Sequence, residues 1–138
     1  MSRYTDRAKE LRAIVEPHYN CAQSVLIPYA EALGLGHESA RDLAACFGSG
    51  MKMGSVCGAF TGGLMALGLF GVSDNESVER FREGMKANHD GVVDCAELLR
   101  RNEEAGGDRK VHCNGLVLEA VALVEEILKS KGKLPEEG

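Results

Sequence analysis

Cysteines are the residues of this chain that are best suited to chemistry. There are five, none of them in a CxxC pair, which excludes the spacing of thioredoxin-like motifs and zinc knuckles. The opening segment MSRYTDRAKELRAIVEP is charged throughout and shows no apolar signal region, so we expect a cytoplasmic protein. In that setting, cysteines more often serve catalysis, redox exchange or metal binding than permanent disulfides.

Four of the cysteines fall at predicted helix starts, where the first turn has unpaired backbone N–H groups and the helix dipole is positive. This environment stabilises a thiolate and lowers the pKa of the thiol. The carboxylate of Asp94 opposes that effect at Cys95. Each of the four lies within two residues of one that can cap a helix: Cys21 directly after Asn20, Cys57 two residues after Ser55, Cys95 directly after Asp94, and Cys113 between His112 and Asn114.

The fifth cysteine and the four histidines are weaker candidates for a functional role. Cys46 falls three residues after Leu43 on a predicted core-facing helix, so we interpret it as a packing residue. His112 adjoins a cysteine, and His89 lies near acidic residues. Either histidine could assist a thiolate or bind a metal. We assign no role to His18 and His37.

The apolar residues recur at helical spacing almost everywhere, and no convincing alternation of period two is present. We therefore predict an all-α bundle of six to seven helices, with inward-facing residues that include Ile14, Val15, Leu33 and Leu43. The first predicted helix begins at the N-cap Thr5 and ends at Pro17, and the second runs from Asn20 to about Gly34. The third and fourth span about 38–47 and about 56–70. The fifth and sixth begin at the caps Ser73 and Asp94, and the last spans about 114–128.

The segment from Met53 to Leu69 predicts a central, glycine-rich, buried helix. Glycine destabilises a helix interior by about 1 kcal/mol, so Gly58, Gly62 and Gly63 indicate close approach of another backbone. The preceding bend lacks the GK[ST] ending of a phosphate loop. The uncharged stretch between Lys52 and Asp74 is rich in glycine and has no flanking tryptophan, which favours a buried helix over a membrane span.

Composition sets the remaining bounds. A chain of 138 residues that is 44% hydrophobic predicts one globular domain over 1–138, with a core over about 5–128 and a flexible tail over 129–138. The net charge of −5 argues against a nucleic-acid binder. A homo-oligomer is compatible with these observations.

Part of the sequence resembles the C_GCAxxG_C_C family of redox-active proteins. The matching segments are Asn20–Val25, Val56–Gly62, Cys95 and Cys113, and Cys46 matches no family cysteine. The resemblance implies a small helical protein with four characteristic cysteines and a redox role, often associated with transport. The domain is also similar to the helical part of split-Soret cytochromes, in which cysteines hold an iron–sulfur cluster. The haem motif CxxCH is absent here.

Three functions follow as hypotheses. In the first, Cys57 is the attacking thiolate of a thiol redox protein, and Cys21, Cys95 or Cys113 resolves the mixed disulfide with an unidentified redox partner. In the second, Cys21, Cys57, Cys95 and Cys113 together bind zinc or a [2Fe–2S] cluster. In the third, the chain is a non-catalytic module that binds a ligand or partner and has chemically inert cysteines.

Overall fold

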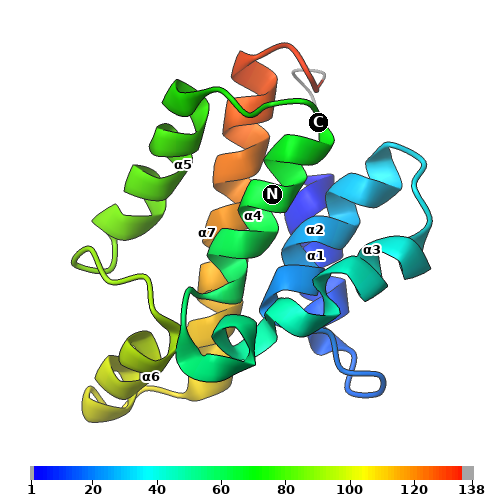
Figure 1. The fold of residues 1–138 in the computed structure, drawn as a ribbon. Helices are drawn as coiled ribbons and strands as arrows, with labels where there is room; N and C mark the ends of the chain where they lie inside the picture. The colour runs from blue at the N-terminus through cyan, green and yellow to red at the C-terminus, as the bar shows by residue number, and fades with distance from the viewer. Residues whose placement is uncertain (1, 135–138) are drawn as a thin grey trace.

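The computed structural model describes residues 2–134 and contains seven α-helices there (Figure 1). An isolated β-bridge is its only strand-like pairing in this range, so the all-α prediction is confirmed. A 3₁₀ turn, Ala45–Phe47, and a π-type segment, Gly50–Gly54, connect α3 to α4. The helices are α1 Arg3–Ala13, α2 Cys21–Ala32, α3 His37–Ala44, α4 Gly58–Leu69, α5 Asn75–Ala87, α6 Cys95–Glu104 and α7 Arg109–Ser130.

Several helix starts differ from their predicted positions. Helix α1 begins at the cap Ser2, whose side chain accepts the N–H of Thr5, so the predicted cap Thr5 is wrong. Helix α5 is capped by Asp74 in place of Ser73. Helix α7 begins after the cap Asp108, more than a full turn before the predicted start. In each case a second capping residue lies close by in the sequence, and the pattern of apolar residues does not distinguish between them.

The core lies between α2, α4 and α7. Tyr29 of α2 is fully buried, stacks on Tyr4 with ring centroids 4.7 Å apart, and donates a 2.5 Å hydrogen bond to the carbonyl of Val121 in α7. This one side chain therefore joins α1, α2 and α7. A buried hydroxyl costs free energy unless it has a partner, and the Val121 carbonyl supplies one.

Four residues predicted to face inward are exposed in the structure. Ile14 and Val15 follow the last residue of α1, and Leu33 is the C-cap of α2, so none of the three lies on the apolar face of a helix. Leu43 is inside α3 but is 60% exposed. At the other end of the chain, α7 continues to Ser130 and Leu134 is buried, whereas residues 135–138 of the predicted tail lie outside the described part.

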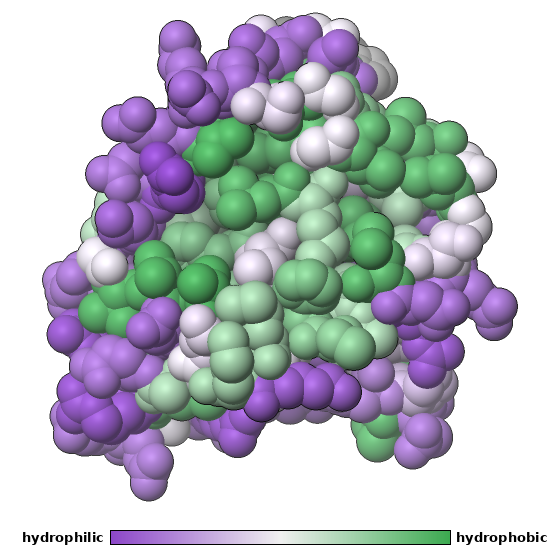
Figure 2. Space-filling view, in the orientation of Figure 1, coloured by the Kyte–Doolittle hydropathy of each residue, from purple (hydrophilic) through white to green (hydrophobic). Residues whose placement is uncertain are grey.

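Apolar residues gather in the middle of the face shown in Figure 2, over α4 and its neighbours, with hydrophilic residues around them. Seven residues of α4 are buried, three of them glycines, which agrees with the predicted central glycine-rich helix. Within residues 2–134, no helix combines the length and the apolar character needed to cross a bilayer.

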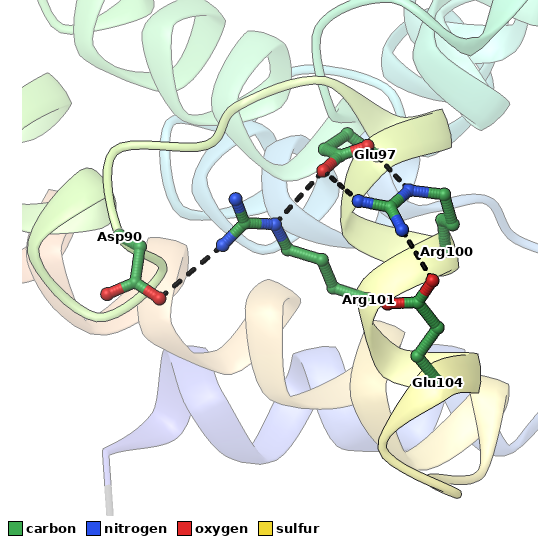
Figure 3. Close-up of polar contacts among 5 residues, drawn as sticks. All are labelled: Asp90, Glu97, Arg100, Arg101 and Glu104. Carbon is green, nitrogen blue, oxygen red and sulfur yellow. Dashed lines mark hydrogen bonds and ion pairs between the residues drawn. The ribbon is translucent and has the colours of Figure 1, made fainter.

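Helix α6 is fixed on its outer side by a network of ion pairs (Figure 3). Glu97 accepts hydrogen bonds from both Arg100 and Arg101, which lower the pKa of this carboxyl to about 2. Arg101 also pairs with Asp90, 3.4 Å away in the segment between α5 and α6. Single exposed ion pairs contribute little, but this network links the helix to the loop that precedes it.

Candidate functional site

Four cysteines gather where the N-terminal ends of several helices meet, and we call these four the thiol cluster: Cys21, Cys57, Cys95 and Cys113. In Figure 1 the starts of α2, α4 and α7 lie at the same end of the bundle. Cys21 and Cys95 are the first residues of α2 and α6, and Cys57 is the N-cap of α4. Residues far apart in the sequence therefore come close enough to influence one another's ionisation.

A capping box places Cys21. The side chain of Asn20 accepts the N–H of Gln23, and the side chain of Gln23 accepts the N–H of Asn20, both at 2.8 Å. The predicted box is therefore confirmed. The Asn20 amide also donates to the carbonyls of Ala44 and Ala45, which ties the start of α2 to the end of α3.

Cys57 and Cys95 are linked through their backbones. An isolated antiparallel bridge pairs Val56 with Asp94, the residues that directly precede these two cysteines. Beside it, the N–H of Cys95 donates to the carbonyl of Ser55 across 2.6 Å. Neither Ser55 nor Asp94 makes the predicted side-chain cap, because Cys57 caps α4 and the Asp94 side chain accepts no capping bond from α6.

Two glycines let α4 pack directly against the start of α2. A Cβ on Gly58 would lie 3.0 Å from the backbone nitrogen of Ala22 and 3.2 Å from the Cβ of Cys21. One turn later, a Cβ on Gly62 would lie 2.7 Å from the carbonyl oxygen of Ala22. The close approach predicted for these glycines is confirmed, and it brings the segment that holds Cys57 beside Cys21.

The Cys21 and Cys113 thiols share a hydrogen bond, so the ionisation of one thiol depends on the protonation state of the other. This bond is the largest of the causes that bring the pKa of Cys113 down to about 6; burial opposes it, and the charges of Arg12 and Arg109 add to it. The same hydrogen bond, followed by burial, raises the pKa of Cys21 far above its usual range. Cys113 is therefore the sulfur of the pair that ionises first.

Cys57 does not have the acidity expected of a cysteine at a helix start. It is 3% exposed, and burial raises the pKa of its thiol to about 11 despite hydrogen bonds from the backbone of α4. Its own N–H is occupied by the carbonyl of Val93 at 2.8 Å. The expected lowering of the pKa is therefore wrong for this residue, because desolvation of the thiolate outweighs the helix terminus.

The other cysteines also differ in part from expectation. Cys113 is the fifth residue of α7, so its lowered pKa comes from Cys21 and two arginines and not from a position at the helix start. Burial is the first cause that raises the pKa of Cys95. Cys46 lies exposed in the 3₁₀ turn after α3, so the prediction that it packs in the core is wrong.

A hollow of about 450 Å³ opens onto the thiol cluster. Cys21, Cys95 and Cys113 line it together with Arg12 and Arg109, whereas the buried Cys57 is not among the lining residues. Sequence analysis did not find the two arginines. Arg109 lies four residues before Cys113 on one helix, so it could have been found if α7 had been predicted to start at Asp108.

The histidines near the cluster form a separate group. His89 lies 2.9 Å from a carboxylate oxygen of Glu119, and its ring meets that of His112 edge to face at 6.5 Å. Burial, followed by the charge of His89, lowers the pKa of His112, and its Nε2 atom is buried without a hydrogen-bond partner. Neither ring lines the hollow that holds the thiols.

The segment before α4 adopts a rare conformation beside the cluster. Residues 49–52 all have positive φ, and only Gly50 among them is a glycine. A Cβ on Gly50 would lie 2.9 Å from the Cβ of Cys95. This left-handed turn therefore lies against Cys95 and contributes Ser49 to the lining of the hollow, at a conformational cost that L residues seldom accept.

The hypothesis of a metal centre concerns the same four thiols. Thiolates are ligands that zinc and iron–sulfur clusters prefer, but within residues 2–134 no group of three or more His, Cys, Asp or Glu side chains is placed to hold a metal ion. The four thiols as they stand are therefore not arranged to hold a metal ion together.

Comparison with known proteins gives one match. A family model described as "Putative redox-active protein (C_GCAxxG_C_C)" covers residues 19–127, a range that contains every cysteine of the chain. No curated protein and no solved structure matches the chain.

Proposed function

The chain belongs to the C_GCAxxG_C_C family, and we propose that it carries out thiol–disulfide exchange with Cys113 as the attacking thiolate and Cys21 as the resolving thiol. The hydrogen bond between these two thiols, in a hollow lined by Arg12 and Arg109, is the observation that carries the proposal. An attacking thiol works best when its pKa lies near the ambient pH, and Cys113 meets that condition.

The reaction takes place in two displacements. The Cys113 thiolate attacks one sulfur of a substrate disulfide, the S–S bond breaks, and the first substrate thiolate leaves. The Cys21 thiol then loses its proton and attacks the Cys113 sulfur, which releases the second substrate thiolate. The protein gives up two electrons and forms a Cys21–Cys113 disulfide. The two protons of its cysteines end on the two product thiols.

Cys95 is the second candidate for the resolving role. It lines the same hollow, its charge raises the pKa of Cys57, and the charge of Cys113 in turn raises the pKa of Cys95. Cys57 is too buried to meet a substrate directly, so it takes no part in the two displacements.

The experiment uses the full chain with Cys46→Ser, which removes the exposed thiol. The reduced protein is mixed with the neutral reagent 4,4′-dithiodipyridine, and released thiopyridone is followed by absorbance. We expect rapid release followed by a Cys21–Cys113 crosslink in the peptide map. Cys21→Ser should trap the mixed disulfide on Cys113, and Cys113→Ser should abolish the rapid phase.

Two results would overturn the assignment. A crosslink between Cys95 and Cys113 would transfer the resolving role to Cys95. A rapid phase that survives Cys113→Ser would exclude Cys113 as the nucleophile.

A further inference from the structure

The hollow beside the thiol cluster is positively charged, in contrast to the chain as a whole, which carries a net charge of −5. Arg12, Arg109 and Lys110 line it, and no Asp or Glu is among its lining residues. Charged walls of one sign raise the local concentration of ligands of the opposite sign.

These positive charges are not neutralised by neighbouring carboxylates. Arg12 donates to the side-chain oxygen of Asn114 at 2.7 Å and to the carbonyl of Tyr19 at 2.9 Å, which are both uncharged partners. Within residues 2–134, no ion pair joins Arg12, Arg109 or Lys110 to an acidic residue. Arginines elsewhere in the fold do form such pairs with glutamates: Arg7, Arg80, Arg100 and Arg101.

A neighbouring hollow of about 360 Å³ extends the positive surface. Arg12 and Lys110 line both hollows, and Lys9 joins them in the second. A ligand with two separated negative charges could therefore place one near Arg109 and the other near Lys110, which lines both hollows.

The first hollow also has an apolar wall, formed by Ile14, Val15 and Leu99. Ile14 and Val15 are the residues that the fold leaves exposed after the end of α1. A wall of this kind suits an organic body better than a bare inorganic anion, and a volume of about 450 Å³ lies in the range of small-molecule sites.

We propose that this hollow selects small disulfides whose two halves each carry a carboxylate, and that Lys110 and Arg109 provide the selectivity. The proposal rests on the thiol–disulfide exchange proposed above and names its substrate class. The chemical step is the two-displacement exchange described above. The carboxylates bind beside the basic side chains, and the disulfide between them meets the Cys113 sulfur.

The test compares three aliphatic disulfides of similar size. They are 3,3′-dithiodipropionate with two negative charges, 2-hydroxyethyl disulfide with none, and cystamine with two positive charges. Each rate with the reduced full-length protein is divided by the rate of the same disulfide with 2-mercaptoethanol, which removes differences in intrinsic reactivity. We expect the dianion to exceed the dication by at least about tenfold at low salt, and the ratio to shrink as salt is added.

Two variants test whether the preference for the dianion comes from the charges of the hollow. Lys110→Gln should lower the ratio of dianion to neutral disulfide several-fold, whereas Arg82→Gln removes the same charge from the exposed side of α5 and should leave this ratio unchanged. The neutral disulfide serves as the reference in every variant, so a change in Cys113 itself cancels from the ratio.

The outcomes separate the two proposals. If all three disulfides react at equal normalised rates, or if Lys110→Gln and Arg82→Gln behave alike, the anion selectivity is wrong and thiol exchange stands. If none of the three oxidises the protein, both proposals fail.

Discussion

Gly62 of α4 faces the backbone of Ala22 in α2 so closely that a Cβ on the glycine would lie 2.7 Å from the Ala22 carbonyl oxygen and 2.9 Å from its Cα. Both atoms belong to the main chain, so neither can rotate away. Ala22 directly follows Cys21, which means that the spacing between the two helices also sets the position of this thiol.

Gly62→Ala should therefore destabilise the protein, by about 1–3 kcal/mol in the free energy of unfolding, because the added methyl group forces α4 away from α2. Urea denaturation measures the change. Gly68→Ala in the same helix is the matched control, since nothing lies within 4 Å of its added Cβ. We expect that variant to gain up to about 1 kcal/mol, because alanine favours helix more than glycine. Equal changes in the two variants would contradict the packing argument.

The acidity of Cys113 gives a second prediction. In the Cys46→Ser protein, the rate at which iodoacetamide alkylates Cys113 should rise with pH and be half-maximal near pH 6, since only the thiolate reacts and its pKa is about 6. Below that pH the protonated thiol should be slow. Mass mapping of the peptide that contains Cys113 provides the measurement.

The same experiment with Cys21→Ala tests the cause of that acidity. The hydrogen bond from Cys21 is the largest contribution that lowers the pKa of Cys113, so its removal should shift the profile to higher pH. A profile that stays in place would assign the effect to Arg12 and Arg109 alone.

A third prediction concerns Cys57. Because this thiol is 3% exposed and its pKa is raised to about 11, it should resist alkylation at pH 7.5 in the folded protein and react fully in urea. Cys46 provides the exposed reference within the same sample. If Cys57 is labelled as fast as Cys46 in the native state, the described burial is incorrect.

Oxidation should also change stability. A Cys21–Cys113 disulfide would close a loop of about 90 residues, and the chain-entropy estimate for such a loop is roughly 4–5 kcal/mol. We expect the oxidised protein to melt at least about 10 °C above the reduced one in calorimetry. Cys21→Ser cannot form this bond, so its melting temperature should be the same under both conditions. A lower melting temperature for the oxidised wild type would indicate a strained crosslink.

Sequence reasoning succeeded where local patterns determine structure. The all-α fold, the Asn20 capping box and the close approach at Gly58 and Gly62 all follow from residue type and spacing. It was less successful at helix boundaries, where Asp108 and Asp74 compete with neighbouring capping residues.

The acidity of the thiols could not be predicted in the same way. A helix start favours a thiolate at both Cys21 and Cys57, yet burial and neighbouring groups raise the pKa of each. The pKa of Cys113 is lowered by Arg12, which lies about 100 positions away in the sequence. Such contributions to a thiol pKa come from tertiary contacts, and these contacts determine which cysteine ionises first.

The left-handed turn at residues 49–52 has a practical consequence for protein engineering. Met51 and Lys52 have φ angles of 60° and 59°, values that glycine adopts without steric cost. Exchanging either for glycine is therefore a route to a sturdier protein, although the same exchange weakens most other positions. The segment before α4 is therefore expected to gain stability by losing a side chain, whereas α4 itself is expected to lose stability when Gly62 gains one methyl group.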